Sequence, residues 1–397
     1  MDYHGDQINM RKILKSVKWS KLKHAYGSAS NVPKTILELT SPDSAVRENA
    51  IWRLYGNIFH QGTRYEAAMF AIPFLGMLLE EEKVLDKHEI IYLLVNLAIG
   101  YDESFFPDGL NPVEYRQNLQ HSKDNMLIEH RTAYRRYGAG PHVDLTCYNR
   151  VQKEVPKFIV NLTDDNKLVR CAASYALAWF PDEMEISIPG LKSHLISDPH
   201  PENLATTIIS IGLVANNSLN YVDLKIFDNY LNHESALVRI CAAISMAINL
   251  DRPTRIIVET LVEALQIAVD IQSTDQTIPF NEGNLAGLVS LVLVKCKQNS
   301  IDMIIPALCK ALEVVGPYHS LDITQSILQI IIDNNSIALK DQDPRLLTPL
   351  QRQALQALAN HGVWEIDGGM FVNYSNLVRA YGIPDGREKL LAYLNRP

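Results

Sequence analysis

The sequence contains none of the short motifs by which common enzymes bind nucleotides, metals or acyl groups. There is no GxGxxG dinucleotide motif, no GxxxxGK[ST] phosphate loop, no GxSxG nucleophile turn and no HExxH zinc motif, since His88-Glu89 lacks the second histidine. The twelve histidines are scattered without metal-ligand spacing. We therefore expect no metal and no cofactor. The sequence leaves open whether the protein is an enzyme and favours that it is not.

Cysteine is also scarce. Cys147, Cys171, Cys241, Cys296 and Cys309 are an odd number and form no CxxC pair, which is typical of a protein from a reducing compartment. Cys171 and Cys241 each follow shortly after an arginine, inside an apolar stretch. We expect these two to be buried packing residues rather than nucleophiles or metal ligands.

Long hydrophobic runs are missing as well. The longest apolar stretch, residues 286–294, is interrupted by Gly287 and Ser290 and is far too short for a membrane-spanning helix. The polar start MDYHGDQINMRK has no feature of a secretory signal. We expect a cytoplasmic protein without a membrane span.

Neither an excess of basic charge nor a flexible linker is present. The formal net charge is -8 and the pI is near 5.9, which argues against a groove that binds phosphate backbones. At 397 residues the chain exceeds one ordinary hydrophobic core, so several domains or one repeat array are expected. Because no stretch rich in glycine, serine or proline divides the chain, the array is favoured.

What the sequence does contain is a recurring spacing. Three stretches carry the pattern Val-Arg-x-x-Ala, and their arginines are Arg47, Arg170 and Arg239. Pro156 lies fourteen residues before Arg170, and Pro33 lies fourteen residues before Arg47. This repetition predicts equivalent structural units along the chain.

Each copy has the pattern of two helices joined by a polar turn. Before Arg170, apolar residues recur at helical spacing at Val155, Phe158, Ile159 and Leu162, which predicts a helix with one buried stripe. A small polar residue stands four positions before each arginine, where it can accept hydrogen bonds from the first amides of the second helix. These residues are Asp43, Asn166 and Ser235. One such pair cannot bury its apolar face alone, so stacking is required, and weaker copies predict roughly eight or nine repeats of about 40 residues.

The pattern of proline, acidic turn and Val-Arg resembles the HEAT repeat, and its Val-Arg-x-x-Ala form resembles the HEAT-like repeats of phycobilisome-lyase type. The stretches LYGNIFHQGTRYEAA and NYSNLVRAYGIPDGREKLLAYL are similar to segments of uncharacterised bacterial HEAT-repeat proteins. The resemblance implies an all-α fold, a right-handed α-α superhelix related to armadillo solenoids. It also implies a bacterial source and a role in protein binding.

The expected order along the chain is a cap, repeats, an insertion, repeats and a second cap. Residues 1–30 form a basic capping helix, residues 31–100 and 151–347 form HEAT-like repeats, residues 101–150 form an irregular polar insertion, and residues 348–397 form the C-terminal repeat and cap. The basic first segment can alternatively bind an anionic membrane or nucleic acid as an amphipathic helix.

Two places are candidate binding sites. The insertion gathers arginine, histidine and tyrosine, a combination enriched at interaction hot spots, at Arg131, Tyr134, Arg135, Arg136 and His142. The second place is the polar cluster around Gly62, with His60 and Arg64. The alternatives are a solvated helical hairpin for the insertion and a simple turn for the cluster, with Gly62 in the left-handed conformation.

Two functions remain open. The first is a non-enzymatic scaffold that recognises a partner protein on the concave face formed by the second helices of the repeats. The second is a HEAT-like nucleic-acid-binding enzyme that resembles the alkylpurine DNA glycosylases, which would need a local basic patch in the insertion. A nucleic-acid partner is disfavoured by the overall charge. The oligomeric state and the identity of the partner stay undetermined by the sequence.

Overall fold

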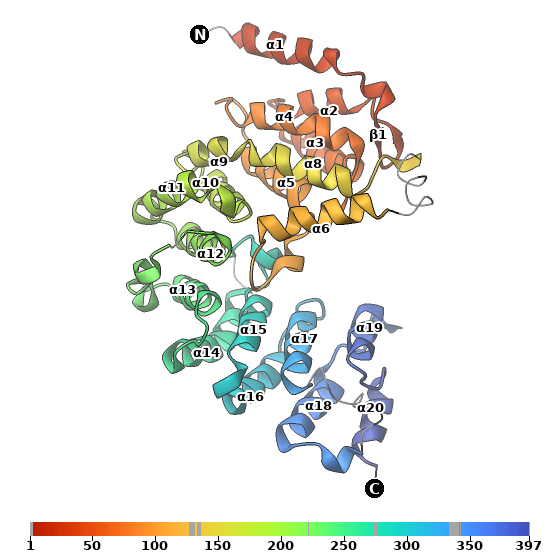
Figure 1. Cartoon of the computed structure of the whole chain (residues 1–397), viewed down its shortest axis with the longest axis vertical. Coiled ribbons are helices and arrows are strands. Elements are labelled where there is room, and N and C mark those ends of the chain that lie inside the picture. The colour runs from red at the N-terminus through yellow and green to blue at the C-terminus, as the bar shows by residue number, and fades with distance from the viewer. Residues whose placement is uncertain are drawn as a thin grey trace. The chain divides into compact units, whose positions relative to one another are not determined.

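The structure is a computed structural model of the whole chain (Figure 1). It describes residues 3–126, 132, 136–220, 222–272, 277–332, 341 and 343–396. These residues form two compact units, one of residues 1–105 and 109–222, the other of residues 106–108 and 223–397. We call them unit 1 and unit 2 and describe each by itself.

Unit 1 is a row of helices with two short hairpins. Its α-helices are α1 (Tyr3–Ser16), α2 (Val32–Glu38), α3 (Ser44–Asn57), α4 (Glu66–Leu78), α5 (Lys87–Ile99), α6 (Pro112–Asp124), α8 (Pro141–Gln152), α9 (Val155–Asn161), α10 (Lys167–Leu177), α11 (Met184–Ser197) and α12 (Pro201–Asn217). Its 3-10 turns are η1 (Trp19–Lys21), η2 (Asp102–Phe105) and η3 (Pro181–Glu183). The antiparallel hairpins join β1 (Lys23–His24) to β2 (Gly27–Ser28) and β3 (Phe59–His60) to β4 (Thr63–Arg64).

Unit 2 continues the same pattern of paired helices. It contains η4 (Leu224–Phe227), η5 (Tyr230–Asn232), α13 (Ala236–Asn249), α14 (Arg255–Gln272), η6 (Phe280–Gly283), α15 (Leu285–Lys295), η7 (Lys297–Asn299), α16 (Ile301–Leu312), α17 (Ser320–Ile331), η9 (Pro344–Leu346), α18 (Pro349–His361), α19 (Val372–Ala380) and α20 (Arg387–Leu394). A third hairpin pairs β5 (Glu365–Ile366) with β6 (Gly369–Met370). The prediction of an all-α fold built from helical hairpins is confirmed.

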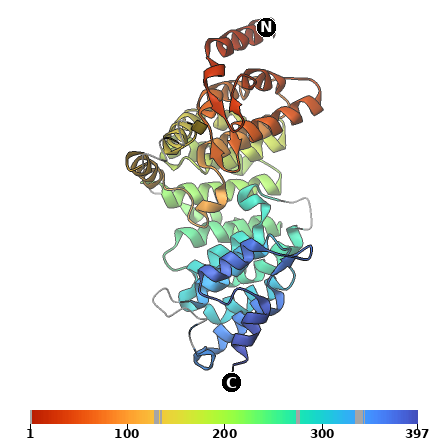
Figure 2. The same ribbon diagram turned by 90° about the vertical axis from the view of Figure 1, so that its right-hand side faces the viewer.

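Consecutive helices pack as antiparallel hairpins, and equivalent helices of neighbouring hairpins stack on one another. In unit 1 the first helices α2 and α4 pack together, as do the second helices α5, α10 and α12 in turn. In unit 2, α14 packs on α16 and α15 on α17. Helix α1 lies at the end of unit 1 beside α2 (Figure 2). Its Met10 and Leu14 side chains are buried.

The predicted helix starts are where the polar residues place them. Asp43 accepts a hydrogen bond from the amide of Ala45 at the start of α3, and Asn166 accepts one from Leu168 at the start of α10. Ser235 stands at the start of α13 but its side chain caps no amide. There the backbone amide of Ser235 donates instead to Nδ1 of His233, so the predicted capping bond is wrong at this position.

The apolar residues of the hairpins make a continuous core in each unit. The largest fully buried side chains include Trp179, Tyr148 and Phe158 in unit 1 and Phe280 and Tyr374 in unit 2. All five cysteines are free and buried, which confirms the packing role expected of Cys171 and Cys241. Among the described helices, none is both long and apolar enough to cross a membrane.

Candidate functional site

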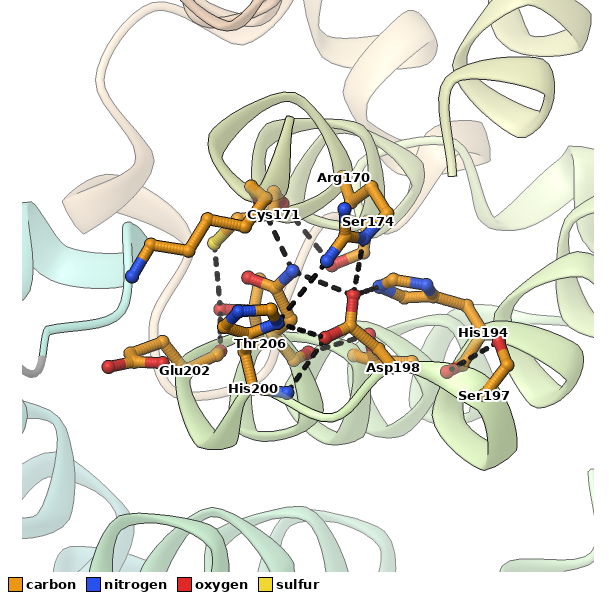
Figure 3. Close-up of polar contacts among 12 residues, drawn as sticks. Arg170, Cys171, Ser174, His194, Ser197, Asp198, His200, Glu202 and Thr206 are labelled. Carbon is orange, nitrogen blue, oxygen red and sulfur yellow. Dashed lines mark hydrogen bonds and ion pairs between the residues drawn. The ribbon is translucent and has the colours of Figure 1, made fainter. Parts of the chain in front are cut away.

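A buried cluster of polar residues around Asp198 has the residue types of a catalytic site (Figure 3). The Arg170 Nε lies 2.6 Å from Asp198 Oδ2, and His200 Nδ1 lies 3.0 Å from Asp198 Oδ1. The Asn203 side chain donates a third hydrogen bond to the carboxylate, which is shielded from solvent. Burial alone raises the pKa of Asp198, but the hydrogen bonds from Arg170, Asn203 and His200 outweigh it and hold that pKa well below its usual range.

The arginine of this cluster also binds the polar turn before it, and this contact, which we call the arginine joint, recurs in the other copies of the repeat. Its role is therefore structural. Arg170 Nη1 donates to the carbonyls of Asp164 and Asp165. Arg47 Nη1 donates in the same way to the carbonyls six and five residues before it, and Arg239 does so too. Arg47 also pairs with a carboxylate, since its Nε lies 2.6 Å from Asp86 Oδ2.

Cys171, beside this joint, is buried, and burial raises the pKa of its thiol to about 11, which disfavours the reactive thiolate. In each of the three copies, the recurring arginine joins the polar turn of the repeat to the second helix of the same repeat. Among the described residues, no group of three or more histidine, cysteine, aspartate or glutamate side chains could hold a metal ion.

A second place, in unit 1, is open to solvent and lined by aromatic rings. We call it the Trp52 pocket; its volume is about 450 Å³, within the usual size of ligand sites. Its walls come from four elements and from the segment after α5, which carries Tyr101. Tyr26 comes from the β1–β2 turn, Trp52, Tyr55 and Gly56 from α3, His60 and Gln61 from the β3–β4 hairpin, and Asn96 from α5, with Arg53, Asn57, Phe59 and Tyr101 completing the lining.

Two hairpin turns form the rim of the pocket. Gln61 and Gly62 both have positive φ, 48° and 79°, which is the two-residue turn that matches the twist of a hairpin. The turn directs His60 against Tyr26 of the neighbouring hairpin, edge to face with ring centroids 5.5 Å apart. The amide of Ala25 donates to the carbonyl of Asn57, so both hairpins are anchored to the end of α3.

Several polar groups of the lining already have partners, and the lining carries little charge. Asn96 donates to the hydroxyl of Tyr55, whose pKa burial raises far above its usual value. The guanidinium of Arg53 is paired with the carboxylate of Glu38. The lining includes no carboxylate and no thiol, and its one guanidinium is ion-paired, so the pocket is an aromatic surface with little net charge and with hydrogen-bonding groups at its edge.

Trp52 and Gly56 lie one helical turn apart on α3, and both line the pocket. Trp52 is 74% exposed and makes no hydrogen bond or ring contact with another described residue. A Cβ atom added at Gly56 would meet no atom within 4 Å. A glycine in a helix costs roughly 0.5–1 kcal/mol relative to alanine. Gly56 therefore leaves the base of the pocket open at the expense of helix stability.

The structure assigns different positions to the two residues predicted around Gly62. His60 lines the Trp52 pocket. Arg64 is buried, with Nε 3.0 Å from Asp144 Oδ1 and Nη2 donating to the hydroxyl of Tyr115. Arg64 thus joins the hairpin to α6 and α8 of the insertion and does not line the pocket. Gly62 has the left-handed conformation that the sequence predicts for it.

The insertion contacts the two hairpins of unit 1 and the residue that follows the second hairpin. Residue Tyr65, after β4, forms an antiparallel bridge with Ala139, and the Lys23 ammonium donates to the carbonyl of Arg136. The side chain of Arg136 is exposed over the ring of Tyr137. The insertion and the hairpins, separated in sequence, are therefore neighbours in unit 1.

His142 is half-buried at the start of α8, where burial and the charge of Lys123 lower its pKa. Arg131, Tyr134 and Arg135 lie outside the described residues. The binding roles of all these residues stay predictions.

Sequence reasoning missed the residues that make the pocket a site. Tyr26, Trp52 and Tyr101 are exposed aromatic residues from three separate elements. Only Trp52 carried a signal in the sequence, an aromatic residue on the polar face of an amphipathic second helix. Their proximity follows from the hairpin geometry, which no local pattern encodes.

No protein-family model matches the chain, and no curated protein matches it in sequence. Solved structures of three helical proteins are similar. The complex of CpcE and CpcF of phycocyanin lyase from Nostoc sp. PCC7120 is 14% identical, with a TM-score of 0.38, over 87% of this chain and 93% of that one. An engineered protein is 14% identical, with a TM-score of 0.29, over 92% of this chain and 99% of that one. Importin beta is 12% identical, with a TM-score of 0.35, over 98% of this chain and 53% of that one.

The fold is an all-α array of repeated helical hairpins, because three hairpins carry the same arginine joint at Arg47, Arg170 and Arg239. This is the architecture that the resemblance to HEAT repeats implies. The sequence differs from those three proteins at most positions, so what they bind is no guide to this chain.

Proposed function

We propose that the chain is a non-enzymatic binding scaffold that recognises a segment of a partner protein in the Trp52 pocket. The observation that supports this most is the exposed Trp52 beside the open base at Gly56. Exposed tryptophan and tyrosine around a concave site are typical of protein-interaction hot spots. The pocket also lies on α3, the second helix of its hairpin, which is the class of helix predicted to form the binding face.

The chemistry of the pocket favours binding over catalysis. Nucleophilic and acid-base catalysis need a titratable group held next to a partner that tunes it. His60 contacts the ring of Tyr26, and the one arginine of the lining, Arg53, is already paired with Glu38. A nucleic-acid ligand would need basic groups that the lining does not offer, so the enzyme alternative has no support from this site.

The test is a selection of peptides from a random displayed library on three full-length proteins. These are the wild type, Trp52→Ser and the control Ile196→Ser, which replaces a residue that is 80% exposed on α11 of the same unit. Substitutions at such exposed positions usually change stability by no more than about 0.5 kcal/mol, so we expect the three proteins to be equally folded, which circular dichroism checks.

The proposal predicts peptides that are enriched on the wild type and on Ile196→Ser and that bind Trp52→Ser at least tenfold more weakly. A tenfold loss corresponds to about 1.4 kcal/mol. If no peptide is enriched, or if the enriched peptides bind Trp52→Ser equally well, the pocket is not a peptide site and the proposal is wrong.

A further inference from the structure

On the basis of the proposed function, we infer the class of segment that the Trp52 pocket binds. The geometry points to an uncharged, proline-rich segment in the extended polyproline II conformation. The inference comes from the charge, the hydrogen-bonding groups and the neighbouring secondary structure of the pocket.

The charges of the lining do not favour a strongly charged ligand. No carboxylate belongs to the lining, so a lysine- or arginine-rich segment would lose its hydration without gaining a counter-charge. The one lining guanidinium, Arg53, is held by Glu38, so an acidic segment has no free cation to meet. A neutral ligand therefore loses the least hydration free energy when it enters the pocket.

The hydrogen-bonding groups at the rim suit a ligand that offers acceptors. Four side-chain groups of the lining make no hydrogen bond with another described residue. They are the indole N–H of Trp52, the hydroxyls of Tyr26 and Tyr101, and the side-chain amide of Gln61. A polyproline II segment has no internal hydrogen bonds, and its carbonyl groups remain available. Proline contributes no N–H of its own, so such a segment brings mainly acceptors to a rim rich in donors.

The surrounding elements disfavour the other common modes of peptide recognition. An added β-strand needs a long free sheet edge, whereas β1 to β4 are two residues each. A docked helix is about 10–12 Å wide and needs a groove several turns long, which is more than a pocket of about 450 Å³ provides. Aromatic rings that flank a shallow site are the surface on which proline-rich segments dock in other recognition modules.

The binding test uses the full chain and a capped, fluorescein-labelled decaproline peptide, followed by fluorescence anisotropy. Unlabelled decaproline, a glycine-serine peptide of equal length and a single-stranded oligothymidine serve as competitors. We expect saturable binding of the labelled peptide. Unlabelled decaproline should displace it, whereas the glycine-serine peptide and oligothymidine should not. Trp52→Ser weakens it at least tenfold, Tyr26→Ala weakens it several-fold, and Ile196→Ser leaves it unchanged.

The outcomes separate the ligand class from the proposed function. If the library selection enriches Trp52-dependent peptides that lack proline, and decaproline does not bind, the ligand class is wrong while the proposed function stands. If the selection also enriches nothing, both are wrong. Displacement by oligothymidine would overturn the peptide assignment in favour of a nucleic-acid ligand.

Discussion

Replacing Gly56 by alanine should make the protein more stable and the Trp52 pocket less able to bind. Gly56 lies in the last turn of α3, and a Cβ there meets no atom within 4 Å. Alanine relieves the conformational cost of glycine without introducing a clash. Because the position is near the helix end, we expect the lower part of the usual gain, about 0.5 kcal/mol.

The gain is measurable as a shift in thermal unfolding. For a unit of this size, 1 kcal/mol shifts the Tm by about 2–4 °C, so Gly56→Ala should raise the Tm of unit 1 by about 1–2 °C. Gly56→Leu should stabilise α3 comparably, because leucine is also a good helix former, and its side chain should occupy the base of the pocket. Calorimetry or circular dichroism provides the Tm, and peptide anisotropy provides the affinity.

The combination of higher stability and weaker binding distinguishes a functional glycine from a packing glycine. We expect the affinity for the selected peptide to fall several-fold in Gly56→Ala and at least tenfold in Gly56→Leu. Gly316→Ala is the control for the affinity, because a Cβ at Gly316 also meets no atom within 4 Å and the residue lies in unit 2, outside the pocket and outside the helices. A lower Tm for Gly56→Ala would show that the glycine is needed for packing, and unchanged affinity in both variants would refute its role in the pocket.

Three further predictions concern the scaffold. Arg170→Met should destabilise the chain by about 3–5 kcal/mol in urea unfolding, because it leaves the Asp198 carboxylate buried without its cation. Arg239→Met removes only bonds to carbonyls among the described residues and should cost about 1–2 kcal/mol. Equal losses in the two variants would contradict the stabilising role of the Arg170–Asp198 ion pair. Burial lowers the pKa of His194, so the unfolded chain takes up its proton first, and stability should fall as the pH falls below about 6.5; His194→Gln should flatten this slope, and an unchanged slope would assign it elsewhere. The five buried thiols should react with a disulfide reagent only when the chain unfolds, whereas a rapid reaction of any thiol in native buffer would contradict its burial.

The repeat architecture could be predicted because its determinants are local. Arg47 and Arg170 stand at the same distance from a proline, and their guanidinium groups bind the carbonyls five and six residues before them. A contact that short in sequence leaves a spacing that can be recognised. The capping roles of Asp43 and Asn166 were predictable for the same reason.

The candidate site could be predicted only in part, because its determinants are distant in sequence. His60 was noticed as part of a polar cluster, whereas its neighbour Tyr26 comes from another hairpin. Arg64 was chosen for its charge, yet it is buried against Asp144, a contact between a hairpin and an insertion that no spacing encodes. The importance of Gly56 became visible only when the space around it was known.

The most direct test of the Trp52 pocket is ¹⁹F NMR of the full chain labelled with 5-fluorotryptophan. The protein has four tryptophans, and Trp19, Trp179 and Trp364 are buried. The Trp52 resonance is assigned with Trp52→Phe. We predict that the selected peptide shifts the Trp52 resonance in a saturable way and leaves the other three in place. Saturable binding that leaves the Trp52 resonance unmoved would place the site elsewhere and contradict the account.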